Sequence, residues 1–119
     1  MTFLFINPNI IFYFSKYPPT EFGKYIVNSK YIPSKNKIVF GLSKIEYNDQ
    51  FKKELSIALV HELRHKEQLI LSDFNWTFSN KPYMWQPEEI DAFAHEIAYC
   101  INNNIYSVFG NQCVGNNQI

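Results

Sequence analysis

The chain has 119 residues, of which 46% are hydrophobic and 18% aromatic, and its 11 basic residues balance its 11 acidic ones. This length suits one domain with one core, and the apolar content excludes a disordered chain. A chain without net positive charge lacks the general attraction to phosphates that nucleic-acid-binding proteins use, so we expect no nucleic-acid partner. The apolar N-terminus is divided at Asn7-Pro8-Asn9 into runs too short to span a bilayer, so we expect no membrane insertion.

The chain contains two cysteines, Cys100 and Cys113, without a C-x-x-C pair or the spacing of zinc ligands. This usage favours two idle thiols over a disulfide, which is typical of a reducing compartment. We therefore expect a cytoplasmic protein.

The first 45 residues carry the signals of a small sheet. Residues 2–6 and 10–14 are short β-branched and aromatic runs, and residues 38–42 form the clearest strand. Residues 20–28 are compatible with either a short helix or a strand. Gly41, inside the clearest strand, indicates a bulge or a close approach of another group to the backbone. We predict a small, mostly antiparallel sheet.

A long helix is predicted over residues 51–71, with Asn48 or Asp49 as its cap. Its apolar positions surround more than one face, as in a helix that runs through the middle of a small domain; they include Leu55, Ile57, Ala58, Leu59, Val60 and Leu63. Arg64, Lys66 and Glu67 are expected to form its solvated face. Residues 72–86 follow as a long loop rich in aromatic side chains, which favours an ordered loop.

Pro87 suits the first position of a second helix, where Glu88 and Glu89 would interact favourably with the helix dipole. An apolar stripe with helical spacing follows; it comprises Ile90, Phe93, Ala94, Ile97, Ala98 and Ile101. The helix is expected to end near residues 102–104, and a polar tail begins at about Gly110. These elements predict a single α+β domain over residues 1–119, with the sheet packed on two main helices.

The run His61-Glu62-Leu63-Arg64-His65 lies within the predicted long helix and matches the pattern H-E-x-x-H. Residues four apart in a helix project to one side, so both imidazoles would face the same point. Two neutral imidazoles held in this way suit Zn²⁺, and the glutamate between them can reach a water on the metal. The motif therefore predicts a zinc site with His61 and His65 as ligands.

A catalytic zinc site needs a third protein ligand. His95, the only other histidine, projects far from the apolar stripe of the second helix and is therefore expected to face solvent. Glu89 and Asp91 lie on the flanks of that stripe, where a neighbouring helix can be reached. The pattern leaves both of them open as the third ligand, with Glu96 as a more distant alternative.

Together, His61-Glu62-x-x-His65 and the later run Glu89-Ile90-Asp91-Ala92 resemble the gluzincin group of zinc metallopeptidases. Similar patterns occur in small single-domain phage and bacterial metallopeptidase-like proteins. The resemblance covers roughly residues 51–101 and implies that Glu89 is the third ligand, because gluzincins use a glutamate followed three residues later by alanine. Where several gluzincins carry Asp or Asn to orient a ligating imidazole, this chain has Phe93. Gln68, Asp91 or Glu96 could take that role.

The resemblance implies hydrolysis of a peptide or protein substrate with one Zn²⁺ as cofactor. Glu62 would accept the proton of the metal-activated water and pass it to the leaving amine. A tyrosine (Tyr83, Tyr99 or Tyr106) could stabilise the oxyanion, and the strand over residues 38–42 could pair with an extended substrate. The compartment would be the cytoplasm of a host cell, or the virion if a phage encodes the protein.

Two other functions are compatible with the same residues. One is a catalytically inactive, zinc-stabilised binding or structural module, such as a virion component or a regulator. The other is a helical interaction protein without metal that uses the aromatic loop as its contact surface.

Overall fold

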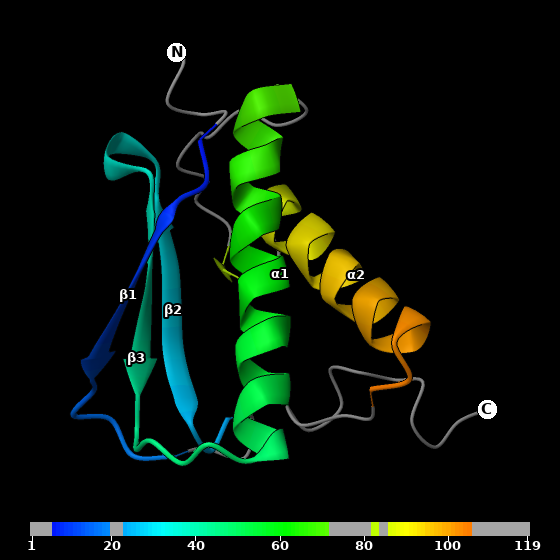
Figure 1. Cartoon of the computed structure of the whole chain (residues 1–119). Coiled ribbons are helices and arrows are strands. Elements are labelled where there is room, and N and C mark those ends of the chain that lie inside the picture. The colour runs from blue at the N-terminus through cyan, green and yellow to red at the C-terminus, as the bar shows by residue number, and fades with distance from the viewer. Residues whose placement is uncertain (1–5, 20–22, 72–81, 84–85, 106–119) are drawn as a thin grey trace.

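The computed structural model of the chain describes residues 6–19, 23–71, 82–83 and 86–105. In Figure 1, the long helix α1 lies between the sheet and the second helix. The elements, in chain order, are β1 (Asn9–Phe14), β2 (Ile26–Ile32), β3 (Lys37–Leu42), α1 (Asp49–Leu71) and α2 (Pro87–Asn102). The predicted α+β class, with a small sheet packed on helices, is confirmed.

The sheet is mixed, in contrast to the mostly antiparallel sheet that we predicted. Its strand order is β1-β3-β2, with β1 parallel to β3 and β2 antiparallel to β3. β2 and β3 form a hairpin through a 3-10 turn at Pro33–Lys35. Asn36 closes this turn with a φ of 45°, a left-handed conformation that asparagine tolerates. β1 is parallel because it pairs with β3 and not with the strand that follows it in sequence.

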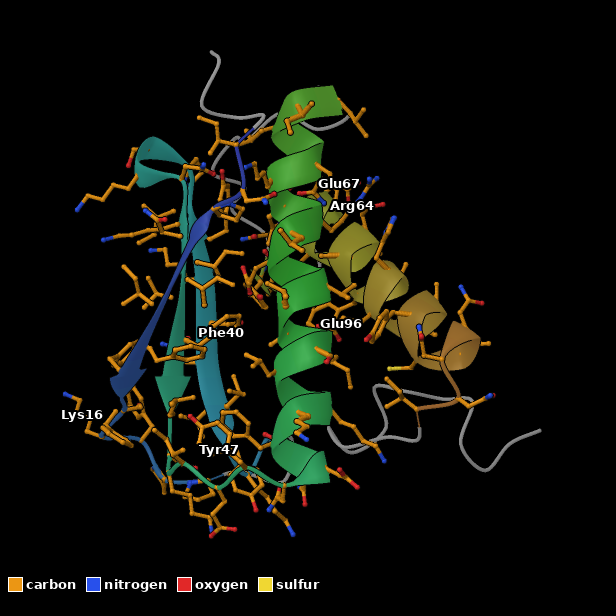
Figure 2. The ribbon with its side chains drawn as sticks, in the orientation of Figure 1. Lys16, Phe40, Tyr47, Arg64, Glu67 and Glu96 are labelled. Atoms are coloured by element: carbon orange, nitrogen blue, oxygen red, sulfur yellow. The ribbon has the colours of Figure 1, made fainter. Side chains whose placement is uncertain are left out.

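The core lies between the sheet and α1. Alternate side chains of β3, namely Ile38, Phe40 and Leu42, are almost completely buried and point toward the helix. Figure 2 shows Phe40 between the strands and α1. These residues belong to a buried cluster that also contains Tyr25, Ile26, Tyr31, Phe51 and Ala58.

Gly41 allows a close approach on the opposite face of the sheet. A Cβ atom at this position would lie 2.8 Å from the hydroxyl of Tyr13 and 3.2 Å from Cβ of Asn28. The predicted close approach is confirmed, and the irregularity in the pairing falls on β2, between Ile26 and Asn28.

Both helices begin where their capping signals predict. Oδ1 of Asn48 accepts a hydrogen bond of 2.8 Å from the amide of Phe51, so Asn48 caps α1. Pro87 is the first residue of α2, and the last helical residue is Asn102. The interior position that we predicted for α1 is confirmed, because it packs against β2 on one side and α2 on the other.

The orientation of α2 differs from the expectation based on its apolar stripe. The side turned to α1 carries Glu89, Ala92, Glu96 and Cys100, which are buried. Two members of the stripe, Ile90 and Ile101, are 50% and 48% exposed. Polar contacts of Glu89 and Glu96 with α1 therefore orient this helix more strongly than its apolar pattern does.

Cys100 is buried and disulfide-bonded. The expectation of two idle thiols is therefore wrong for Cys100, and the argument for a reducing compartment that rested on it is lost. Cys113 lies outside the described residues. The same holds for most of the aromatic loop, for the polar tail and for the predicted strand at 2–6, of which only Ile6 is described. Neither helix in the described part of the chain combines the length and hydropathy needed to cross a bilayer.

Candidate metal centre

Three buried side chains from the two helices converge: His61, His65 and Glu89. Nε2 of His61 lies 3.0 Å from Oε1 of Glu89, and Nε2 of His65 lies 3.1 Å from Oε2 of the same carboxylate. The two imidazole Nε2 atoms are 3.2 Å apart. One potential ligand atom from each residue therefore lies within 4.8 Å of the others, as in a site for one metal ion.

Local structure explains the convergence. His61 and His65 are one helical turn apart on α1, and their rings meet edge to face with centroids 4.8 Å apart. Glu89 occupies the first turn of α2, where that helix packs against α1. Ala92 follows one turn later and is completely buried, so its small side chain permits the close approach of the two helices.

Glu96 orients the imidazole of His61. Oε1 of Glu96 lies 2.9 Å from Nδ1 of His61, and Figure 2 shows Glu96 projecting from α2 toward α1. The two atoms are close enough for an ion pair but are not aligned for a hydrogen bond. The other carboxylate oxygen, Oε2 of Glu96, has no hydrogen-bond partner among the described residues. Phe93, at the departure from the gluzincin pattern, instead packs its ring against His61 with centroids 4.8 Å apart.

Gln68 orients the imidazole of His65. Its Oε1 lies 3.0 Å from Nδ1 of His65, so it accepts the proton when that nitrogen carries one. The amide group of Gln68 donates to Oδ2 of Asp91 at 3.0 Å and to the carbonyl of Glu88 at 2.9 Å. Arg64 donates to the same carboxylate oxygen of Asp91 at 2.5 Å. Gln68, one of the three residues considered for orienting an imidazole, is therefore a completely buried link between the helices.

The contacts of Glu96 and Gln68 with the two Nδ1 atoms leave both Nε2 atoms facing Glu89. A protein metal site typically holds each imidazole through its second nitrogen in this way. The donor set of two imidazole nitrogens and one carboxylate fits Zn²⁺, and other divalent transition metals accept the same ligands. The residues present therefore fit the metal that the sequence motif predicts.

The electrostatics of the cluster favour positive charge at its centre. Burial lowers the pKa of His61, but interactions with Glu89 and Glu96 outweigh burial and raise it to about 10. Burial likewise lowers the pKa of His65, but hydrogen bonds with Glu89 and Gln68 raise it by more, so the pKa of His65 lies above its usual value. Burial raises the pKa of Glu89, yet the two imidazoles and Tyr83 hold it well below its usual range. Protons and a divalent cation would compete for this centre.

Glu62 faces the sheet. Its Oε2 accepts a hydrogen bond of 2.6 Å from the hydroxyl of Ser29, and its Oε1 accepts one of 3.0 Å from the amide of Tyr31. Both donors belong to β2, so Glu62 connects α1 to that strand. The carboxylate is 4% exposed and adjoins the same cavity as His65 and Glu89.

The cavity has a volume of about 260 Å³. It is lined by Ser29, Lys30 and Tyr31 of β2, Glu62 and His65 of α1, and Tyr83 and Glu89. Of the tyrosines considered for an oxyanion, Tyr83 lies here, and it helps to hold the pKa of Glu89 low. Tyr99 packs with Ile57 and Cys100 instead. Tyr106 lies outside the described residues.

The structure corrects the strand that we expected to bind a substrate. Residues 38–42 lie in β3, the central strand, whose two edges are occupied by β1 and β2. An extended peptide cannot add to that strand. β2 is the edge strand next to the cluster, and it supplies residues to the cavity.

His95 lies outside the cluster, with its Nδ1 3.0 Å from the carbonyl of Asp91 in the preceding turn. The predicted solvated face of α1 is wrong for Lys66, which is 6% exposed and donates to Oδ1 of Asn36 at 3.0 Å and to the carbonyl of Ile6. Ser29 was missed because it follows the ambiguous segment 20–28, and nothing in the sequence connects it with Glu62. Spacing could have indicated Gln68, which lies three residues after His65 on one helix.

No protein-family model, curated protein or solved structure matches this chain. The resemblance to gluzincins therefore rests on the motif residues of the sequence alone.

Proposed function

We propose that the protein is a zinc-dependent metallopeptidase that hydrolyses a peptide or protein substrate. The observation that supports this function best is the convergence of His61, His65 and Glu89 beside a cavity that Glu62 also lines. These three residues would hold the metal. When bound, Zn²⁺ supplies Lewis acidity that makes water more acidic and polarises a carbonyl group.

Glu62 would act as the general base. Each of its carboxylate oxygens accepts one hydrogen bond, from Ser29 or from the amide of Tyr31, and an ionised carboxylate oxygen can accept a second. The two bonds fix the orientation of the carboxylate while leaving capacity to take a proton. Tyr83, which also lines the cavity, would donate a hydrogen bond from its hydroxyl to an oxyanion.

The substrate would lie in the cavity along β2. Exposed strand edges bind extended peptides through backbone hydrogen bonds, and β2 is the strand at the edge of the sheet near the cluster. Because the carboxylate of Glu62 already accepts from the amide of Tyr31, substrate pairing would begin nearer Ser29.

A zinc-stabilised module without turnover is the second candidate. It is favoured by the two hydrogen bonds that Glu62 makes to β2, because a carboxylate that fastens a strand has a structural reason to be present. In this alternative the metal joins α1 to α2, and Glu62 joins α1 to the sheet.

Metal analysis and a matched pair of substitutions test these functions. We expect purified protein to hold one zinc per chain and to cleave members of a broad peptide library. The substitution Glu62→Gln should retain the zinc and lower cleavage by roughly 10²–10⁴-fold, because it removes the base. Glu67→Gln, the same change at an exposed position of α1, is the control and should leave cleavage unchanged.

The outcomes separate the candidates. Zinc-loaded wild type that cleaves nothing would support the structural module, in particular if Glu62→Gln lowers only the free energy of unfolding. Less than a few tenths of a zinc per chain, after refolding with added metal, would exclude both zinc functions.

A further inference from the structure

β1 presents an uncovered apolar surface at the edge of the sheet farthest from β2. All six of its residues are exposed, and Ile10, Phe12 and Phe14 are 45%, 48% and 69% exposed. These three side chains share the face of the sheet that α1 packs against, because the ring of Phe12 stacks on buried Phe40 at 5.7 Å. Figure 1 shows α1 beside β2, so the helix does not cover β1. We refer to Ile10, Phe12 and Phe14 as the β1 strip.

The backbone of the same three residues faces outward. The amide of Asn9 donates to the carbonyl of Asn36 at 3.1 Å, and the amide of Ser15 donates to the carbonyl of Leu42 at 2.8 Å. Odd-numbered residues of β1 therefore direct their backbone groups toward β3, and the even-numbered residues direct theirs away from it. No strand of the described part of the chain pairs with this outer edge.

The edge lacks the features that normally prevent strands from pairing. Natural edge strands carry lysine, proline or a bulge that blocks an added strand, whereas Asn9–Phe14 contains no charged residue and no proline. The chain has a net charge of zero, so two copies do not repel each other at long range. Both properties favour association with an identical edge.

We propose that β1 pairs antiparallel with β1 of a second copy, joining the two sheets across a two-fold axis. Such an interface is self-complementary and closes after two chains. Hydrogen bonding requires that outward-facing, even-numbered residues lie opposite each other. The register that places Phe12 opposite Phe12 also places Ile10 opposite Phe14, so the whole strip forms cross-strand apolar pairs. The register that pairs Ile10 with Phe12 would leave out Phe14, the most exposed apolar residue of β1, and the register that pairs Phe12 with Phe14 would leave out Ile10.

This contact is independent of the proposed zinc site. The cluster lies between α1 and α2, on the far side of β3 and β2 from the outer edge of β1. One strand pair with its side chains buries less than the roughly 800 Å² per partner of a standard interface. We therefore expect a reversible dimer with a Kd of about 1–100 µM.

Sedimentation over a range of concentrations tests the dimer. Wild type should shift from monomer to dimer as its concentration rises to about 500 µM. Phe14→Lys should weaken the association at least tenfold by placing a charge in the apolar strip. Leu71→Lys is the matched control, since Leu71 is 56% exposed at the end of α1, and it should associate like wild type. Circular dichroism should show an unchanged fold in both variants.

Cross-linking tests the register. Opposed residues of a hydrogen-bonded pair have Cα atoms about 5.5 Å apart, a separation that a disulfide spans. Phe12→Cys should therefore give a disulfide-linked dimer under mild oxidation, whereas wild type and Ile11→Cys should not. A wild type that stays monomeric at every concentration would overturn the proposal, as would cross-linking through Ile11 in place of Phe12. Loss of zinc binding or of cleavage would leave this result unaffected.

Discussion

Glu89 and Asp91 are two residues apart on α2 and have different partners. The carboxylate of Glu89 contacts both imidazoles, with one oxygen near each Nε2 atom. The carboxylate of Asp91 accepts from Arg64 and Gln68 and contacts neither imidazole of the cluster. The proposed ligand role belongs to Glu89, and Asp91 is connected to the cluster through Gln68.

We expect Glu89→Ala to abolish stoichiometric zinc binding, because two imidazoles alone make a weak site. Asp91→Ala should retain the metal with an affinity lowered by about 10–100-fold, the usual effect of losing an outer hydrogen-bond partner. Isothermal titration with zinc in a competing chelator measures both affinities. The opposite order, with Asp91→Ala losing the metal and Glu89→Ala retaining it, would reverse the assignment.

At the level of residues, the sequence predicts those parts of the site that depend on local spacing. The two histidines follow from helical periodicity, and Glu89 follows from the resemblance to gluzincins. Glu96 remained one of several candidates for orienting an imidazole, because its contact with His61 depends on how α2 rotates. The hydrogen bond from Ser29 to Glu62 joins residues 33 positions apart, and no local pattern indicates it.

At the level of elements, two glutamates two turns apart on α1 fasten β2. Glu54 is completely buried and accepts hydrogen bonds from the amides of Lys24, Tyr25 and Ile26, at 3.2, 2.9 and 3.0 Å. Glu62 binds the other end of the strand. The carboxylates therefore satisfy backbone donors that a neighbouring strand would satisfy in a larger sheet.

We expect Glu54→Ala to lower the free energy of unfolding by about 3–5 kcal/mol, because it leaves the buried amides of Tyr25 and Ile26, and the partly buried amide of Lys24, without their acceptor. Gln50→Ala removes only the hydrogen bond of 3.1 Å between Gln50 and Glu54, and it should cost less than about 1 kcal/mol. Urea unfolding followed by circular dichroism measures both. If the urea midpoint of Glu54→Ala equals that of wild type, these hydrogen bonds make no net contribution to the free energy of unfolding.

The elements whose limits could be predicted are those with capping signals. Asn48 and Pro87 mark the starts of α1 and α2 in the sequence as they do in the structure. β2 was only partly anticipated: its first residues fall in the segment 20–28, which fitted a helix or a strand, and its middle residues, Asn28, Ser29 and Lys30, are polar and give no strand signal. The face of α2 was predicted wrongly because apolar periodicity carries no information about the carboxylates that bind α1.

At the level of the whole molecule, the helices and the sheet are joined by buried charge as well as by apolar packing. The apolar cluster lies between α1 and the sheet, whereas the contact between α1 and α2 includes His61, His65, Glu89 and Glu96. Protons on the imidazoles stabilise that contact in metal-free protein. The pKa of His61 is about 10 when folded and near 6.5 when unfolded, so this stabilisation is complete below about pH 6.5 and is lost as the pH rises to about 10.

Zinc at the proposed site would have to displace those protons, which would set the pH dependence of metal binding. Because the pKa values of His61 and His65 are both raised, binding at neutral pH should release on the order of one to two protons per metal ion. The apparent zinc affinity should therefore rise about tenfold or more for each pH unit between 6 and 9.

Chelator competition at several pH values measures this slope, and pH-indicator absorbance counts the released protons. Glu67→Gln, at an exposed position of α1, should give the wild-type slope. An affinity that does not change with pH would mean that zinc binds elsewhere, because any metal held by these two imidazoles has to compete with the protons that Glu89 and Glu96 stabilise.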